Sequence, residues 1–184
     1  MRMGGERIDW TMDDVAYLVE NAGRVPLREI CRHLRRSSES VRHMARRLRG
    51  QGYPVSLRHF EPRTTICPSC GRSSATAREV GICRPCQLRR QLASIEAQTA
   101  DLMARLPPEA RATYEQTEAE TGARTREPRP QAPRLDATAT YYQRMRAAEA
   151  HDIALEQWET RRMEREVKAA QKRKERIARK IRDR

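Results

Sequence analysis

Apolar and polar residues recur at helical spacing through residues 1–50, and this pattern predicts three short helices. The first helix begins after Thr11, which fits a capping box with Asp14. The second begins with Pro26 in its first turn, a position that tolerates proline, and the third follows Ser38, a residue type that caps helices. Each helix has one apolar stripe, so we expect the three helices to share a compact core.

The third predicted helix carries basic residues on the side away from its apolar stripe. Residues 24–49 contain nine basic and two acidic residues, whereas residues 1–23 contain two basic and five acidic residues. A basic helix fits the major groove of DNA, where arginine contacts phosphate or binds guanine. The alternative is a solvated basic face on a structural helix. The candidate DNA-binding residues are Ser38, Ser40, Arg42, His43, Arg46, Arg47 and Arg49.

The three segments Trp10 to Leu18, Pro26 to Leu34 and Arg36 to Leu48 resemble the Myb/SANT-like trihelical DNA-binding domains of phage, mobile-element and bacterial regulatory proteins. The resemblance covers under a quarter of the chain, which has only Trp10 of the regularly spaced tryptophans of Myb repeats. It implies a helix-turn-helix fold whose last helix enters the major groove. It also implies that four residues of that helix face bases or phosphates: Arg42, His43, Arg46 and Arg47.

A short connector, residues 51–62, follows the predicted three-helix unit. Tyr53, Val55 and Leu57 alternate with polar or small residues in it, which is typical of a strand with one buried face. We therefore expect an edge strand or wing over Gly52 to Phe60.

Four cysteines form the pattern C-x2-C-x12-C-x2-C within residues 63–90, at Cys67, Cys70, Cys83 and Cys86. Two such pairs can complete a tetrahedron of thiolates around one Zn²⁺, and with four protein ligands the ion is structural. We expect a zinc ribbon with strands at residues 64–66 and 74–80. Its excess of arginine indicates a second nucleic-acid contact or a docking module, or else the ribbon only orients its neighbours.

A heptad seam follows the last cysteine and predicts a coiled-coil helix over residues 87–106. Its members are Leu88, Leu92, Ile95, Thr99, Leu102 and Leu106. Such a seam indicates that the helix packs on another helix, either in a homodimer or within the same chain. Residues 107–136 then read as a polar helix, Glu109 to Thr121, and a proline-rich linker, Gly122 to Pro133.

Residues 137–184 contain no Gly or Pro and predict one long basic helix. It has a weak heptad seam at Met163, Val167, Ala170, Lys174, Ile177 and Ile181. Such a helix can track phosphates, bind an acidic partner, contribute to a homodimer, or be a solvated tail. Secondary nucleic-acid contacts are expected at Arg84, Arg89, Arg90, Lys172, Arg173, Lys174 and Arg176.

The composition indicates several small folded units rather than one domain with a large hydrophobic core. The chain has 184 residues, of which 38% are hydrophobic, and a net charge of +13, a balance typical of proteins that meet polyanions. We find no membrane span, signal peptide, nucleophile, phosphate loop or paired catalytic carboxylates, so we expect a cytoplasmic, nucleoid-associated protein that is not an enzyme.

The sequence therefore predicts a mainly α protein with a helix-turn-helix domain, a four-cysteine zinc ribbon, a coiled-coil-like helix and a long basic helix. The function expected is sequence-specific binding of double-stranded DNA by a transcriptional regulator or DNA-transaction accessory factor. The alternatives are an assembly or adaptor protein in a larger nucleic-acid-processing complex of a phage or mobile element (packaging, recombination or polymerase accessory), or an RNA-binding scaffold.

Overall fold

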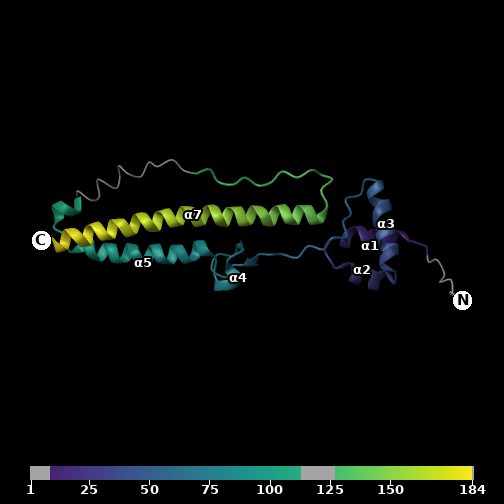
Figure 1. Ribbon diagram of the computed structural model, residues 1–184, viewed down its shortest axis with the longest axis horizontal. Coiled ribbons are helices and arrows are strands. Elements are labelled where there is room, and N and C mark those ends of the chain that lie inside the picture. Colours follow the sequence, from purple (N-terminus) through teal and green to yellow (C-terminus); the bar gives the residue numbers. More distant parts are fainter. Residues whose placement is uncertain (1–8, 113–126, 184) are drawn as a thin grey trace. The chain divides into compact units, whose positions relative to one another are not determined.

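The computed structural model of the chain describes residues 9–112 and 127–183 (Figure 1). These residues are mainly helical, as predicted, and contain one two-stranded sheet. The chain divides into two compact units. The N-terminal unit consists of residues 1–62 and 132–150, and the cysteine unit consists of residues 63–131 and 151–184.

The three predicted N-terminal helices are present as α1 (Met12–Asn21), α2 (Leu27–Leu34) and α3 (Ser38–Gly50). α1 begins with the predicted capping box, in which the hydroxyl of Thr11 accepts from the backbone N–H of Asp14. The expected cap of α3 was one residue off. Ser37, not Ser38, accepts from the backbone N–H of Ser40 at 3.2 Å, because only its extended backbone aims the hydroxyl into the first turn.

The turn between α2 and α3 is only three residues long, 35–37. Arg35 follows α2 as its C-cap and adopts the left-handed conformation with φ of 52°. Pro26 lies at the N-cap of α2, one residue before the helical turn in which we expected it. A short turn of this kind lets α2 and α3 cross while their apolar stripes meet.

The core of the N-terminal unit is formed by α1, α2, α3 and the connector that follows them. Its buried residues are Leu18, Ala22, Ile30, Val41, Ala45, Leu48 and Val55. The strand or wing predicted over Gly52 to Phe60 is absent, since these residues form neither a strand nor a helix. Of the three alternating residues, Val55 is buried and Leu57 packs against the helical core, whereas Tyr53 is exposed, so only part of the alternation corresponds to packing on the helices.

The first turns of α7 (Tyr141–Arg182) also belong to the N-terminal unit. The guanidinium of Arg24 lies over the ring of Tyr141 at 5.0 Å, and that of Arg58 over the ring of Tyr142 at 4.5 Å. Arg146 stacks on Phe60 at 5.1 Å. α7 begins four residues later than the start predicted at residue 137.

The cysteine unit contains β1 (Thr65–Ile66) and β2 (Ser73–Ser74), which pair antiparallel, and α4 (Ala77–Val80). The strand predicted over residues 74–80 was therefore wrong beyond Ser74. The hydroxyl of Ser74 accepts from the backbone N–H groups of Thr76 and Ala77 at 3.1 and 3.0 Å, which ends the strand and starts the helical turn.

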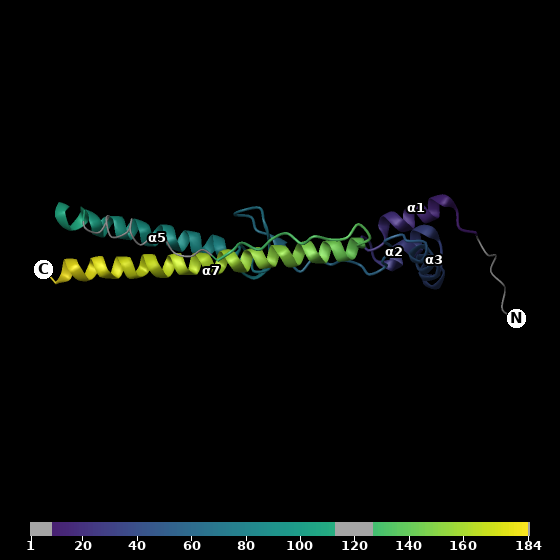
Figure 2. The ribbon, with the colours of Figure 1, turned by 90° about the horizontal axis from the view of Figure 1, so that it is seen from above.

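α5 (Arg84–Ala104) and α7 lie side by side in both views and run in the same direction (Figures 1 and 2). Leu88 and Ile95 cluster with Met163 and Val167. Further along the two helices, Ile177 clusters with Met103, Leu106 and Ala110. The two predicted heptad seams therefore face each other with a constant offset in residue number. Of the two interpretations left open for the α5 seam, the structure shows packing on another helix of the same chain.

One polar layer interrupts this seam. Thr99 is buried and donates to the backbone oxygen of Ile95 at 2.7 Å, while Lys174 donates to the side-chain oxygen of Gln98 at 2.9 Å. Residues 113–121 of the polar helix predicted over Glu109 to Thr121, and residues 122–126 of the predicted linker, lie outside the described residues. No helix in the described ranges is both long and apolar enough to cross a membrane.

Candidate metal centre

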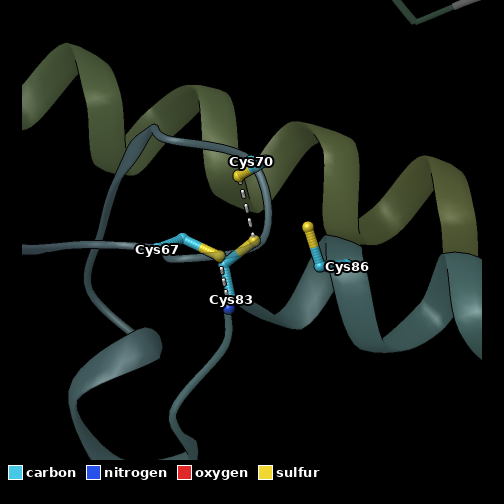
Figure 3. Close-up of side chains that lie close together, drawn as sticks. All are labelled: Cys67, Cys70, Cys83 and Cys86. Atoms are coloured by element: carbon cyan, nitrogen blue, oxygen red, sulfur yellow. Dashed lines mark hydrogen bonds between the residues drawn. The ribbon is translucent and has the colours of Figure 1, made fainter.

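The four cysteines of the predicted pattern meet in one cluster, where their sulfur atoms lie within 4.8 Å of one another (Figure 3). Cys67 and Cys70 come from the turn that follows β1. Cys83 is the N-cap of α5, and Cys86 lies in the first turn of that helix. Two local structures that are separate in sequence therefore supply two ligands each.

The turn between the first two cysteines is a tight one. The backbone N–H of Gly71 donates to the oxygen of Cys67 at 2.8 Å, and the N–H of Cys67 donates to the oxygen of Arg72 at 2.8 Å. Gly71 has a φ of 70°, a conformation that favours glycine. These bonds hold both thiols of the turn on the same side.

The spacing of the sulfur atoms suits a tetrahedral ion. In a tetrahedron with metal–sulfur bonds of about 2.3 Å, adjacent sulfur atoms are about 3.8 Å apart. The Sγ atoms of Cys70 and Cys83 are 3.7 Å apart. The four thiols could therefore hold one metal ion with little movement.

The environments of the four thiols differ. The backbone N–H of Cys83 donates to the sulfur of Cys67 at 3.3 Å, and this bond lowers the pKa of Cys67 to about 6. Burial raises the pKa of Cys70 and that of Cys83. The Cys67 thiolate is thus stable near neutral pH in the protein alone, whereas Cys70 and Cys83 need a nearby cation to lose their protons.

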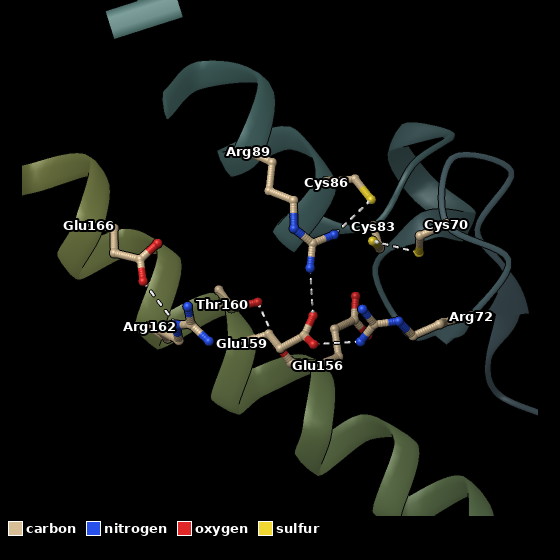
Figure 4. A network of polar contacts seen from close by, with 10 residues as sticks. All are labelled: Cys70, Arg72, Cys83, Cys86, Arg89, Glu156, Glu159, Thr160, Arg162 and Glu166. Carbon is tan, nitrogen blue, oxygen red and sulfur yellow. Dashed lines mark hydrogen bonds and ion pairs between the residues drawn. The ribbon is translucent and has the colours of Figure 1, made fainter. Parts of the chain in front are cut away.

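Glu159 of α7 binds two arginines that lie beside the cysteine cluster (Figure 4). Its carboxylate accepts from Arg89 at 3.1 Å and also from Arg72. Arg89 in turn donates to the sulfur of Cys86 at 3.7 Å. Guanidinium groups at this distance offset the negative charge that four thiolates leave around a divalent ion.

Glu156, one turn earlier in α7, binds the hairpin next to the cysteines. It accepts from the hydroxyl of Ser74 at 2.6 Å, the backbone N–H of Ala75 at 2.7 Å and the hydroxyl of Thr76. Burial acts to raise the pKa of Glu156, but these hydrogen bonds outweigh it and hold the pKa below its usual value. The buried carboxylate is therefore charged and fully bonded.

Neither glutamate was found from the sequence. Glu156 lies seven residues before Met163 and so occupies a seam position of the α7 heptad pattern. A carboxylate at a seam position must be paired when it is buried, and this was the available signal. Its partners, about eighty positions earlier, have no local signature.

The structure places the predicted DNA-binding residues on α3. All are exposed except Ser40, which is half-buried. Arg49 donates to the backbone oxygen of Val55 at 3.4 Å. Within residues 9–112 and 127–183, no ion pair involves Arg42, Arg46 or Arg47.

The predicted secondary contacts do not share one face. Arg84 lies 3.9 Å from Glu164, and Arg89 is bound to Glu159. Lys174 is half-buried and holds Gln98, and Arg173 is also half-buried. The remaining members of the predicted set are exposed: Arg90, Lys172 and Arg176.

Comparison with known proteins gives no family assignment, because the chain matches no protein-family model, no curated protein and no solved structure.

Proposed function

We propose that the chain is a sequence-specific DNA-binding protein in which α3 enters the major groove. The observation that carries the proposal is the division of α3 into two faces. Val41, Ala45 and Leu48 are buried in the core, whereas Arg42 and Arg46 are exposed and form no ion pair with any described residue. Unpaired guanidinium groups one helical turn apart suit guanine edges and phosphates.

The short turn before α3 supports the same proposal. In helix-turn-helix domains a short turn sets the last helix across the one before it, so that its outer face is free to enter the groove. The turn of residues 35–37 is braced by Arg36, which forms an ion pair with Asp14 at 2.7 Å and lies over the ring of Trp10 at 4.4 Å. α3 is therefore held in place both by its buried face and by the turn that precedes it.

The metal that we propose for the cysteine cluster is zinc. Four thiolates in a tetrahedron are a donor set that zinc prefers, and they leave no position for an activated water. Cys67, Cys70, Cys83 and Cys86 would hold the ion, which would link the turn after β1 to the start of α5. Native mass spectrometry tests this proposal, with one zinc ion per chain expected and a metal-free folded protein as the contradicting result.

The DNA-binding proposal is tested by selecting bound sequences from a random duplex library at a stated salt concentration. The wild-type chain is expected to enrich one sequence. The double variant R42A/R46A is expected to lose that preference, because each bidentate contact to a base discriminates by about 1–3 kcal/mol. Both side chains are exposed, so the variant should keep the helical content of the wild type.

The matched control is R28A/R32A, which removes two exposed arginines from α2 of the same unit. It has the same net charge as R42A/R46A and should select the wild-type sequence. An unchanged preference in R42A/R46A, or an equal loss in both variants, would contradict base reading by α3.

A further inference from the structure

A line of basic side chains runs along the solvent face of α7 within the cysteine unit. It consists of Arg161, Arg165, Lys168, Lys172, Arg176 and Arg179, here called the α7 stripe. All six side chains are exposed. With 3.6 residues per turn, their spacing keeps them on one face, and at 1.5 Å per residue they extend over about 27 Å.

The opposite face of the helix explains why the stripe faces solvent. Met163, Val167 and Ile177 are buried against α5, and the stripe lies about half a helical turn away from them. The seam thus fixes the rotation of α7, and this rotation leaves every member of the stripe in water.

The first two members of the stripe already bind an anion of the chain itself. The two carboxylate oxygens of Glu127 accept from Arg161 at 3.0 Å and from Arg165 at 3.2 Å. Two guanidinium groups one turn apart that converge on a carboxylate can take a phosphate in the same way. The other four members, Lys168, Lys172, Arg176 and Arg179, form no ion pair with any residue that the structure describes.

We propose that the α7 stripe is a second DNA-binding surface that takes the backbone phosphates of a duplex, and that Glu127 competes with phosphate at its N-terminal end. The stripe is as long as roughly eight base pairs, at about 3.4 Å each. This surface binds without regard to sequence, so the proposal does not depend on base reading by α3.

The composition of the stripe favours a duplex over other polyanions. Proteins that bind single strands stack bases on aromatic side chains, and the stripe has none. The neighbouring Trp158 is half-buried and donates its indole N–H to the backbone oxygen of Glu127 at 3.1 Å. An acidic protein partner would need apolar anchors at the centre of its contact, and the stripe contains only Lys and Arg.

The first experiment measures the salt dependence of binding to a labelled duplex that lacks the sequence selected by the wild type. Fluorescence anisotropy on the full-length, metal-loaded chain between about 50 and 200 mM salt gives the slope of log affinity against log salt. The variant K168Q/K172Q/R176Q/R179Q is expected to reduce the magnitude of the slope by about 3.6, at about 0.9 per phosphate contact.

The control variant removes the same number of charges from exposed arginines away from the stripe: R78Q/R105Q/R134Q/R144Q. It should change the slope little, because a diffuse loss of charge releases few counterions. Equal changes in the two variants would overturn the proposal. Displacement of the duplex by polyglutamate at equal charge concentration would also overturn it, in favour of an acidic protein.

The second experiment tests the competition by Glu127. E127Q is expected to bind the same duplex about two- to five-fold more tightly, since exposed ion pairs contribute up to about 1 kcal/mol. The control E96Q removes one exposed carboxylate from α5 and should leave the affinity for the duplex unchanged. No gain in E127Q relative to E96Q would contradict the competition.

Each of the two DNA-binding proposals can be refuted without refuting the other. The quadruple stripe variant should still select the wild-type sequence from a random library. R42A/R46A should lose that preference and keep binding that depends on the stripe.

Discussion

The carboxylate of Glu156 in α7 accepts a hydrogen bond of 2.6 Å from the hydroxyl of Ser74 in β2, 82 positions earlier in the chain. Both residues are buried. This contact joins the long helix to the hairpin beside the four cysteines, and with Glu159 it links residues 151–182 of α7 to the rest of the cysteine unit. The cysteine cluster is therefore braced by a helix that contributes none of the four cysteines.

The variant E156Q should destabilise the cysteine unit by about 1.5–3 kcal/mol, the usual contribution of hydrogen bonds to a charged group. Glutamine offers one oxygen and turns an amide N–H toward donors such as the N–H of Ala75. The midpoint of urea unfolding measures the loss. The control is E166Q on the same helix, whose exposed pair with Arg162 should contribute less than about 1 kcal/mol, and equal losses would contradict the role of Glu156.

The same carboxylate predicts a pH dependence. Hydrogen bonds hold the pKa of Glu156 below its ordinary value of 4.5, so the folded state binds fewer protons than the unfolded state as the pH falls through this range. The stability that this group contributes is present above pH 4.5 and is lost as the pH falls through the lower pKa of the folded protein. The difference in urea midpoint between wild type and E156Q should shrink on acidification, and a constant difference would count against this assignment.

Removal of the metal should unfold the region around the cysteines and leave α1, α2 and α3 folded. The buried cluster there consists of Cys67, Ala77, Cys83 and Cys86, too little apolar surface to fold without an ion. The core of the N-terminal unit contains none of these cysteines. Amide hydrogen exchange with and without a chelator checks this, and equal loss of protection in both regions would be inconsistent with it.

Gly23→Ala should destabilise the N-terminal unit. Gly23 has a φ of 85°, and an added Cβ would lie 3.3 Å from the backbone oxygens of Ser56 and Arg58. The strain of this conformation alone costs roughly 1–2 kcal/mol, and the close contacts add to it. Gly52→Ala is the matched control, since Gly52 has a φ of 89° with no atom within 4 Å of an added Cβ. The melting temperature should be highest for the wild type, lower for Gly52→Ala and lowest for Gly23→Ala. An equal decrease in the two variants would show that the close contacts at Gly23 do not contribute.

Shortening the side chain of Ile177 in the α5–α7 seam should lower the free energy of unfolding, because this side chain is completely buried. Ile177→Ala is expected to lose about 2–5 kcal/mol and Ile177→Val about 0.5–1.5 kcal/mol, because the first leaves the larger cavity. Urea unfolding followed by circular dichroism measures both. If both variants unfold like the wild type, the two helices do not pack through this seam.

Local features of the fold could be predicted because they depend on residues a few positions apart. The capping box of Thr11, the two heptad seams and the cysteine spacing are all of this kind, and each is present. The errors also have local causes: Ser37 and Ser38 are equivalent as residue types, and the hydroxyl of Ser74 turns the chain out of a strand. The strand predicted after Gly52 is absent because Val55 and Leu57 pack on the helices without a neighbouring strand.

By itself, the sequence determined the helices, the four thiols and the excess of basic residues, since helix periodicity and short ligand spacings are read within one segment. Which seam packs against which became visible only in the folded chain. This pairing gives Glu156 its partners, places Lys174 against Gln98 and leaves Lys172 in solvent. Contacts between residues some eighty positions apart depend on how whole elements pack, and no local pattern records them.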